Sequence, residues 1–289
     1  MTEAPNLEHL RGWIGRTETR DDLLSPWTAS AMAAAVRNDG SDWPSGRALP
    51  PLWHWCYFLP TAPQNGLGPD GHPARGGFLP PVPLPRRMWA SSQLEFLAPL
   101  QLGAPARRVS RVEDVTLKHG KSGTLVFVKV THTLQAAGAD GAPLIREQQE
   151  IVYREAAQPG ASAPPPVAPP ANAQWRETLH PDPVLLFRYS ALTFNSHRIH
   201  YDYPYVTQTE GYAGLVVHGP LIATLLLEAA QRQAPGRAVA RYQFKAVRPL
   251  ICGGALRVCG AAPDADGNIA LWAEDGEGAL LMQASMRLA

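Results

Sequence analysis

The sequence lacks the features that mark secreted, membrane-spanning and metal-binding chains. Only three cysteines occur among 289 residues, Cys56, Cys252 and Cys259, without metal-type spacing, so we expect free thiols in a reducing compartment. No apolar run approaches the roughly 20 residues that span a bilayer. The N-terminal stretch carries acidic residues and no apolar core, which argues against a signal peptide. These absences predict a cytoplasmic protein without a membrane partner.

An excess of charge is also absent. The formal net charge is +1 and charged residues make up 18% of the chain, which gives no reason to expect nucleic acid or an anionic membrane as a partner. The hydrophobic content of 45% is typical of a globular protein. The length suits one large domain or two domains of about 100–150 residues.

A low-complexity segment predicts where the chain divides. Residues 156–173 read AAQPGASAPPPVAPPANA, and such a Pro/Ala segment behaves as an extended spacer. We therefore expect an N-terminal half over 1–155 and a C-terminal half over 174–289.

The N-terminal half shows weak helical signals followed by strong strand signals. Residues 28–37 predict a small helix with Thr28 as its N-cap, and residues 52–58 could form a short buried helix. Apolar alternation with short Gly-rich breaks then predicts an antiparallel meander. Its strands are expected at 88–96, 106–119, 125–135 and 144–154.

The C-terminal half contains the pattern around which the fold is predicted. Alternating residues at 184–194 predict a strand, and a polar cluster at 195–202 follows. An almost wholly apolar run at 221–230, opened by Pro220, predicts a helix buried on all sides. Further strands are expected at 238–247, 255–261, 269–274 and 280–287. A sheet wrapped around a buried helix is the hot-dog arrangement, so we expect an α+β double hot-dog with a degenerate N-terminal copy.

The polar cluster resembles a known catalytic loop. Residues 195–200 read Asn-Ser-His-Arg-Ile-His, which is similar to the Asp-x-Asn-Pro-x-His loop of MaoC-like hydratases. His200 is kept, whereas Asn195, His197 and Arg198 replace the aspartate, asparagine and proline. Together with the downstream His-Gly-Pro, the loop resembles type 2 hydroxyacyl-thioester dehydratases and the mesaconyl-C4-CoA and itaconyl-CoA hydratases.

This resemblance implies a hydro-lyase that acts on an acyl-CoA without metal or cofactor, coenzyme A being part of the substrate. His200 is the expected base, because an imidazole can exchange a proton near neutral pH. Asn195 could orient the attacking water, and Asp202, or less readily Glu210, could supply an acid. The alternative is that His200 is a structural histidine at a strand end. A metal site of His197, His200 and Asp202 lacks a fourth ligand and is not predicted.

Other residues are candidates for binding the substrate. The N–H groups at Gly219, at the start of the apolar helix, could receive an enolate oxygen, and His218 could contact substrate or cap the helix. His197 and Arg198 are expected beside the substrate. Basic side chains that could reach the phosphates of coenzyme A are Arg241, Lys245 and Arg248. For each of these three a solvated strand face is an equal alternative. Candidates for a carboxylate on the acyl group are Arg86, Arg87, Arg188 and Arg198, although a solvated surface pair is the preferred interpretation of Arg86 and Arg87.

The predicted reaction is the reversible hydration of a short branched enoyl-CoA. The resemblance favours a C5 dicarboxyl group, mesaconyl-C4-CoA or itaconyl-CoA, giving citramalyl-CoA. The alternatives are a 3-hydroxyacyl-thioester dehydratase of fatty acyl chains, a hot-dog thioesterase and a non-catalytic acyl-CoA-binding protein. Hot-dog sheets often pair edge to edge, so a homodimer or higher homo-oligomer is also expected.

Overall fold

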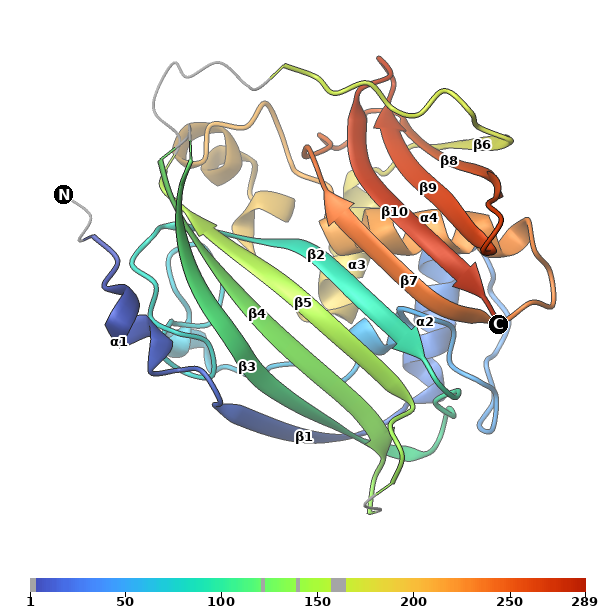
Figure 1. Cartoon of the computed structure of the whole chain (residues 1–289), viewed down its shortest axis with the longest axis horizontal. Coiled ribbons are helices and arrows are strands. Elements are labelled where there is room, and N and C mark those ends of the chain that lie inside the picture. The colour runs from blue at the N-terminus through green and yellow to red at the C-terminus, as the bar shows by residue number, and fades with distance from the viewer. Residues whose placement is uncertain (1–3, 121–122, 139–140, 157–164) are drawn as a thin grey trace.

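A computed structural model describes residues 4–120, 123–138, 141–156 and 165–289. Within these ranges ten strands form one antiparallel sheet in the order β1-β3-β4-β5-β2-β7-β10-β9-β8-β6 (Figure 1). The strands are β1 (Thr17–Leu23), β2 (Arg86–Phe96), β3 (Pro105–Gly120), β4 (Gly123–Ala136), β5 (Ile145–Arg154), β6 (Trp175–Leu179), β7 (Val239–Ala246), β8 (Leu256–Pro263), β9 (Asn268–Asp275) and β10 (Leu280–Leu288). The α-helices are α1 (Leu7–Arg11), α2 (Pro26–Val36), α3 (Pro183–Leu192) and α4 (Gly219–Arg232).

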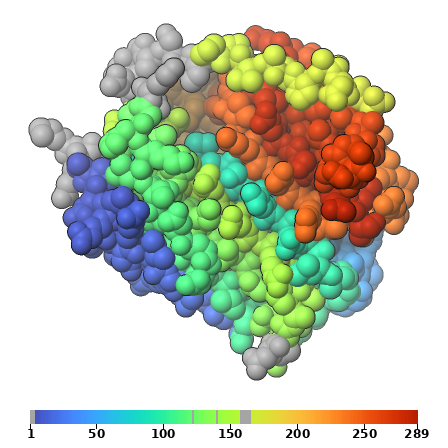
Figure 2. All heavy atoms as spheres, viewed as in Figure 1, coloured from blue at the N-terminus to red at the C-terminus, as the bar shows by residue number. Residues whose placement is uncertain are grey.

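The two halves of the chain meet at the centre of this sheet. Strand β2 pairs with β7, with Gln93 opposite Gln243, and each half contributes five strands on its own side of that pair. The main hydrophobic core also contains residues from both halves. In the space-filling view the N-terminal and C-terminal halves form one continuous face (Figure 2). The sheet therefore holds the halves side by side.

Part of the predicted spacer lies outside the described residues, namely 157–164. Downstream of that gap the chain runs along the C-terminal half, where the carbonyl of Val167 accepts a hydrogen bond from the Leu280 N–H over 2.8 Å. The division at 156–173 stays a prediction.

Helix α4 confirms the predicted buried helix and the hot-dog arrangement. Every residue from 221 to 230 is buried, and the sheet curves around this helix together with α2 and α3 (Figure 1). The hydroxyl of Tyr242 on β7 donates to the carbonyl of Ala223 over 3.0 Å, which ties the helix to the sheet. Glu228 of α4 accepts two hydrogen bonds from Arg37, at 2.6 and 2.8 Å, and this pair links α4 to the end of α2.

The predicted strand at 184–194 is wrong, because these residues form helix α3. Pro183 occupies the first turn, and the side chain of Asp182 caps the helix by accepting from the Leu185 N–H over 2.8 Å. The buried residues are Leu186, Tyr189 and Ser190, which have the i, i+3, i+4 spacing of a helix face. In so short a segment an apparent alternation fits a helix as well as a strand.

The other eight predicted strands are confirmed to within two residues at each end. Helix α2 begins at Pro26 rather than after Thr28, because a proline is favoured in the first turn. Residues 53–56 form a short 3-10 helix, η1, within the predicted 52–58 segment. Strands β1 and β6 were missed because their sequences, TETRDDL and WRETL, are mostly polar edge strands.

All three cysteines are free, as predicted. Among the described residues no helix is long and apolar enough to cross a membrane.

Candidate active site

A cavity of about 1150 Å³ lies between the helices and the sheet and is lined by both halves of the chain. The N-terminal half contributes residues of β2 and of the loop before it, including His72 and Arg87. The C-terminal half contributes Asn195, His200 and Gly219, three of the residues predicted to be catalytic. The fold therefore brings the predicted loop and the start of α4 to one cavity.

His200 is held as a neutral imidazole facing this cavity. The side chain is 7% exposed, and its Nδ1 donates to the carbonyl oxygen of Val216 over 2.7 Å. Burial lowers the pKa of His200 to about 4, and the hydrogen bond to Val216 opposes this effect only in part. Because a carbonyl can only accept, the Nδ1 carries the hydrogen and Nε2 of the neutral ring is a proton acceptor. The geometry suits a base at Nε2.

His218 lies behind His200 and does not line the cavity. Its ring stacks on that of His200 with centroids 3.6 Å apart, and Ser190 hydrogen-bonds to its Nε2 over 2.8 Å. No described residue hydrogen-bonds to its Nδ1. Burial and the neighbouring imidazole of His200 hold the pKa of His218 well below its usual range. In this position His218 supports the ring of His200 and caps α4 through its backbone carbonyl, which accepts from Ile222.

Asn195 and His197 form a tight turn at the cavity wall. The Asn195 side-chain oxygen accepts from the His197 N–H over 3.0 Å, so this oxygen is fixed while the amide N–H₂ is the group that could orient water. The ring of His197 lies perpendicular to that of His200 with centroids 5.5 Å apart. Burial, reinforced by the neighbouring histidines, lowers the pKa of His197 to about 2.

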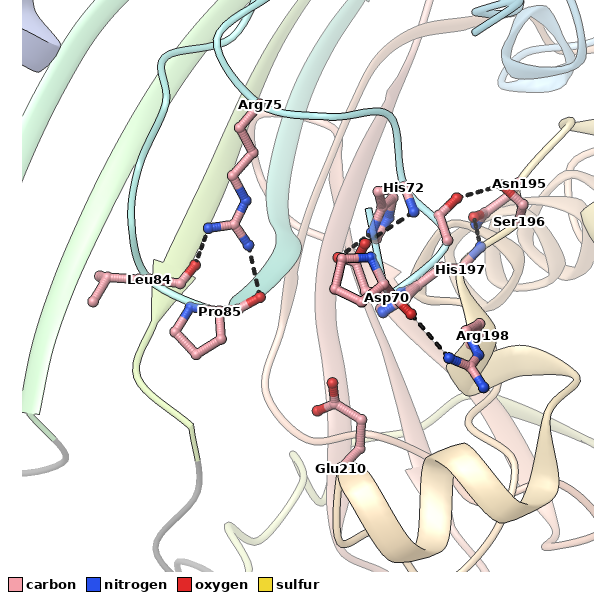
Figure 3. A network of polar contacts seen from close by, with 12 residues as sticks. Asp70, His72, Arg75, Leu84, Pro85, Asn195, Ser196, His197, Arg198 and Glu210 are labelled. Atoms are coloured by element: carbon pink, nitrogen blue, oxygen red, sulfur yellow. Dashed lines mark hydrogen bonds and ion pairs between the residues drawn. The ribbon is translucent and has the colours of Figure 1, made fainter. Parts of the chain in front are cut away.

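A loop of the N-terminal half completes this wall, and sequence reasoning missed it. Asp70 accepts from the Nδ1 of His72 over 3.0 Å, and the ring of His72 packs against that of His197 with centroids 4.1 Å apart (Figure 3). A Cβ on Gly71 would lie 1.9 Å from the carbonyl oxygen of Ser196, so the two backbones touch. The Asp-Gly-His run within the Pro/Gly-rich stretch was the available signal. Local pattern gives no indication of the partner loop 125 residues away.

Asp70, His72 and His197 are also the described residues best placed to hold a metal ion. Their donor atoms lie within 4.8 Å of one another. Burial has the largest effect on the pKa of each of these three groups, and the positive charge of Arg87 also lowers all three pKa values. The same charge opposes a divalent cation at this place. We therefore derive no step through a metal. The set of His197, His200 and Asp202 is not gathered, because the Asp202 carboxylate is bonded to Arg198 and does not line the cavity.

The structure places Asp202 and Glu210 in ion pairs. Asp202 accepts from Arg198 at 2.9 and 2.8 Å and from the backbone N–H of Tyr205, and neither Asp202 nor Arg198 lines the cavity. The bonds from Tyr205 and Arg198 lower the pKa of Asp202. Glu210 lines the cavity but is paired with Arg86 over 2.9 Å. Neither carboxylate is free to act as an acid as it stands.

Gly219 opens α4 at the cavity wall. A Cβ placed on this residue would meet nothing within 4 Å, and both Gly219 and Pro220 line the cavity. The first N–H groups of a helix have no intrahelical partner, and the helix dipole adds positive potential there. An oxyanion can be accommodated at this position.

The predicted basic residues separate into two groups. Arg86, Arg87 and Arg248 line the cavity. Arg241 and Lys245 belong to β7 and do not line it; Arg241 is paired with Glu95 over 3.4 Å on the surface. Their predicted contact with coenzyme A phosphates stays a prediction.

Comparison with solved structures shows the fold. A MaoC-like dehydratase from Phytophthora capsici superposes with a TM-score of 0.69 over 98% of this chain and 99% of that chain, at 15% identity. A Mycobacterium tuberculosis protein described as a double hot-dog superposes with a TM-score of 0.58 over 95% of this chain and 96% of that chain, also at 15% identity. The chain is a double hot-dog protein, as predicted.

Comparison of sequences shows the family. The chain is 46% identical over 279 residues to the mesaconyl-C(4)-CoA hydratase of Chloroflexus aurantiacus, covering 96% of each protein. The model of the hydroxyacyl-thioester dehydratase type 2 family matches residues 52–252, which include the Asp70 loop, the Asn195–His200 loop and the start of α4. With a neutral histidine and an oxyanion position in one cavity, this chain belongs to the type 2 hydroxyacyl-thioester dehydratase family and is a hydro-lyase.

Proposed function

We propose that this protein adds water reversibly across the double bond of a short branched enoyl-CoA. The observation that carries the proposal is the position of His200, whose Nδ1 is fixed on Val216 and which lines a cavity that Asn195 and Gly219 also line. Adding water to a double bond conjugated to a thioester requires a base that deprotonates the water, an acid that protonates the α-carbon and donors that bind the enolate oxygen. These residues can supply all three.

Hydration of mesaconyl-C4-CoA, whose double bond is conjugated to the thioester, would proceed with one proton that His200 takes up and returns. Asn195 orients water, and Nε2 of His200 takes a proton as the water oxygen attacks the β-carbon. The enolate oxygen is stabilised by the N–H groups at Gly219. Burial lowers the pKa of His200 to about 4, so its imidazolium is a stronger acid than a free imidazolium and returns the proton to the α-carbon. The elements of water are then added and His200 is neutral again.

The preferred substrate is a C5 dicarboxyl enoyl-CoA, mesaconyl-C4-CoA or itaconyl-CoA, with citramalyl-CoA as product. The similarity to a mesaconyl-C(4)-CoA hydratase over almost the whole chain supports this choice. No metal or further cofactor is required by these steps. We also propose a cytoplasmic location and a homodimer or higher homo-oligomer, in keeping with the free thiols and with the pairing habits of hot-dog sheets.

A second candidate is the dehydration of fatty 3-hydroxyacyl thioesters. The family model and the size of the cavity, about 1150 Å³ with Trp55, Trp89 and Phe187 in its wall, would suit a longer apolar chain.

The test is a turnover assay in heavy-oxygen water with mesaconyl-C4-CoA, itaconyl-CoA and crotonyl-CoA. We expect the mass of one water to be gained on a dicarboxyl substrate, and His200→Ala to lower kcat/KM by about 10³-fold. The exposed His119 provides a control, since His119→Ala should keep wild-type activity.

Other outcomes would identify other functions. Hydration of crotonyl-CoA alone would favour the fatty acyl dehydratase, and release of free coenzyme A would indicate a thioesterase. Binding without turnover would indicate an acyl-CoA-binding protein. Full activity of His200→Ala would show that the assigned base is wrong.

A further inference from the structure

Positive charge is concentrated in the cavity. The whole chain carries a formal net charge of only +1, yet seven arginines and three carboxylates line the cavity. The arginines are Arg20, Arg75, Arg86, Arg87, Arg108, Arg154 and Arg248, and the carboxylates are Glu18, Asp70 and Glu210. Such a lining attracts an anionic ligand.

Two adjacent arginines of β2 differ in what they contact. Arg86 forms an ion pair with Glu210 over 2.9 Å, with both side chains 13% exposed, and also donates to the Glu210 carbonyl. Arg87 lines the same cavity, but no described residue forms a hydrogen bond or ion pair with its guanidinium. A guanidinium carries five N–H donors, and here no described residue accepts from them. Arg87 can therefore donate to an acceptor on a ligand.

The remaining arginines that could bind an acyl carboxylate are less well placed. Arg198 is occupied by Asp202 and by the carbonyl of Pro69, and it does not line the cavity. Arg188 is exposed on α3 and also lies outside the cavity lining. The structure thus separates the four arginines that the sequence could not rank.

Arg87 lines the same cavity as His72, His197 and His200. Burial is the main cause of the lowered pKa values of His72 and His197, and the positive charge of Arg87 adds to it; the ring of His197 lies 5.5 Å from that of His200. An anion bound by Arg87 would therefore lie close to the atoms that react.

We propose that Arg87 binds the free carboxylate of a dicarboxyl acyl group and determines the enzyme's specificity for it. The inference rests on the proposed function and deepens it. In a mesaconyl-C4 group the carboxylate is attached to the β-carbon, the atom that water attacks. A bidentate contact with the planar guanidinium fixes both carboxylate oxygens, and so turns the β-carbon toward the water on His200.

The experiment separates this contact from turnover. Succinyl-CoA carries a carboxylate on its β-carbon, butyryl-CoA carries a methyl group there, and neither has a double bond to hydrate. Binding of both would be measured by calorimetry to the wild type and to Arg87→Met, Arg87→Lys and the control Arg188→Met. Thermal unfolding would show that each variant is folded.

We expect the wild type and Arg188→Met to bind succinyl-CoA about 30–100-fold more tightly than butyryl-CoA. Arg87→Met should lose that preference while its affinity for butyryl-CoA changes less than about threefold. Arg87→Lys should retain part of it, because lysine keeps the charge but not the bidentate geometry.

Three results would overturn the proposal. The first is a wild type that binds succinyl-CoA and butyryl-CoA equally, and the second is a preference for succinyl-CoA that survives in Arg87→Met. The third is an equal loss of affinity for both ligands in Arg87→Met, which would assign Arg87 to coenzyme A. A wild type that prefers succinyl-CoA but does not hydrate mesaconyl-C4-CoA would support the carboxylate site and refute only the proposed reaction.

Discussion

Each half of the molecule contains a buried polar cluster, and the two are built differently. In the N-terminal half Glu147 is 3% exposed, and its two oxygens accept hydrogen bonds from His54, Trp55, Ser92 and Gln149 at 2.9 to 3.2 Å. Burial raises the pKa of Glu147, but the hydrogen bond from His54, the charges of His54 and His132 and the hydrogen bond from Trp55 outweigh burial and bring the pKa to about 2. A buried carboxylate is tolerated there because its bonding capacity is filled.

In the C-terminal half the buried polar groups form a row of imidazoles, His197, His200 and His218, that His72 extends from the other half. Within the described parts of the chain, His72 alone among these four has a carboxylate partner at hydrogen-bonding distance. Burial then dominates and the rings are neutral. The closed cluster fixes structure, whereas the open row keeps ring nitrogens available for chemistry.

Acidification is expected to have the largest effect, and to act mainly through histidines. His132 and His200 have pKa values of about 4 and His197 about 2, against 6.5 for a free histidine. The unfolded chain therefore binds more protons below pH 6.5, so stability falls as the pH drops toward 4. Each group contributes about 1.4 kcal/mol per pH unit. Urea unfolding at pH 7.5, 6.5, 5.5 and 4.5 measures this slope, and a flat profile down to pH 5 would contradict it.

Glu147→Gln is expected to break the closed cluster. The substitution replaces one accepting carboxylate oxygen with an amide N–H₂, which is a donor and would face the donors of the cluster. We expect the free energy of unfolding to fall by about 3–5 kcal/mol. Urea unfolding at pH 7.5 would measure this loss. The exposed Glu8 gives the control Glu8→Gln, which should change stability by less than about 0.5 kcal/mol. A loss below about 1 kcal/mol for Glu147→Gln would show that the cluster is not structural.

Gly71→Ala tests whether the N-terminal loop positions the open row. Gly71 has φ +87° and its Cβ would meet the Ser196 carbonyl at 1.9 Å, so the two loops must separate. We expect a loss of about 1–3 kcal/mol and a decrease in kcat/KM of about tenfold or more. Gly46 is the matched control, since it has φ +82° but nothing within 4 Å of a Cβ. Equal effects of Gly71→Ala and Gly46→Ala would assign the whole cost to backbone strain.

Ser190→Ala should produce the smallest effect. It removes the 2.8 Å hydrogen bond to Nε2 of His218 and leaves the ring stacked on His200. We expect a loss of about 1 kcal/mol in stability and a change of less than about fivefold in kcat. Thermal unfolding and steady-state kinetics would check both. The control is Ser285→Ala, which removes an exposed hydrogen bond between Gln243 and Ser285 on β10. A large loss of activity would mean that His218 takes part in proton transfer.

Much of the fold could be predicted because the signals are local. The apolar run at 221–230 and the alternation along β4 and its neighbours specify a buried helix and an antiparallel sheet. Helix α3 was misassigned because its ten residues fit both the strand period and the helix period. The N-cap formed by the side chain of Asp182 decides in favour of the helix. Strands β1 and β6 carry too few apolar residues to be recognised, since their place is set by pairing with β3 and β8.

The sequence by itself determined the buried helix, the Asn195–His200 loop and the glycine at the start of α4, because each depends on neighbours within a few residues. Tertiary structure alone decided that Asp70 and His72 complete the site and that Asp202 and Glu210 form ion pairs with arginines. It also decided that no described residue forms an ion pair with Arg87. These outcomes depend on contacts between residues far apart in the chain, such as the bond from Ser196 to Gly71 across 125 positions. Periodicity and spacing carry no information about such contacts, since they arise only when the sheet brings the two halves together.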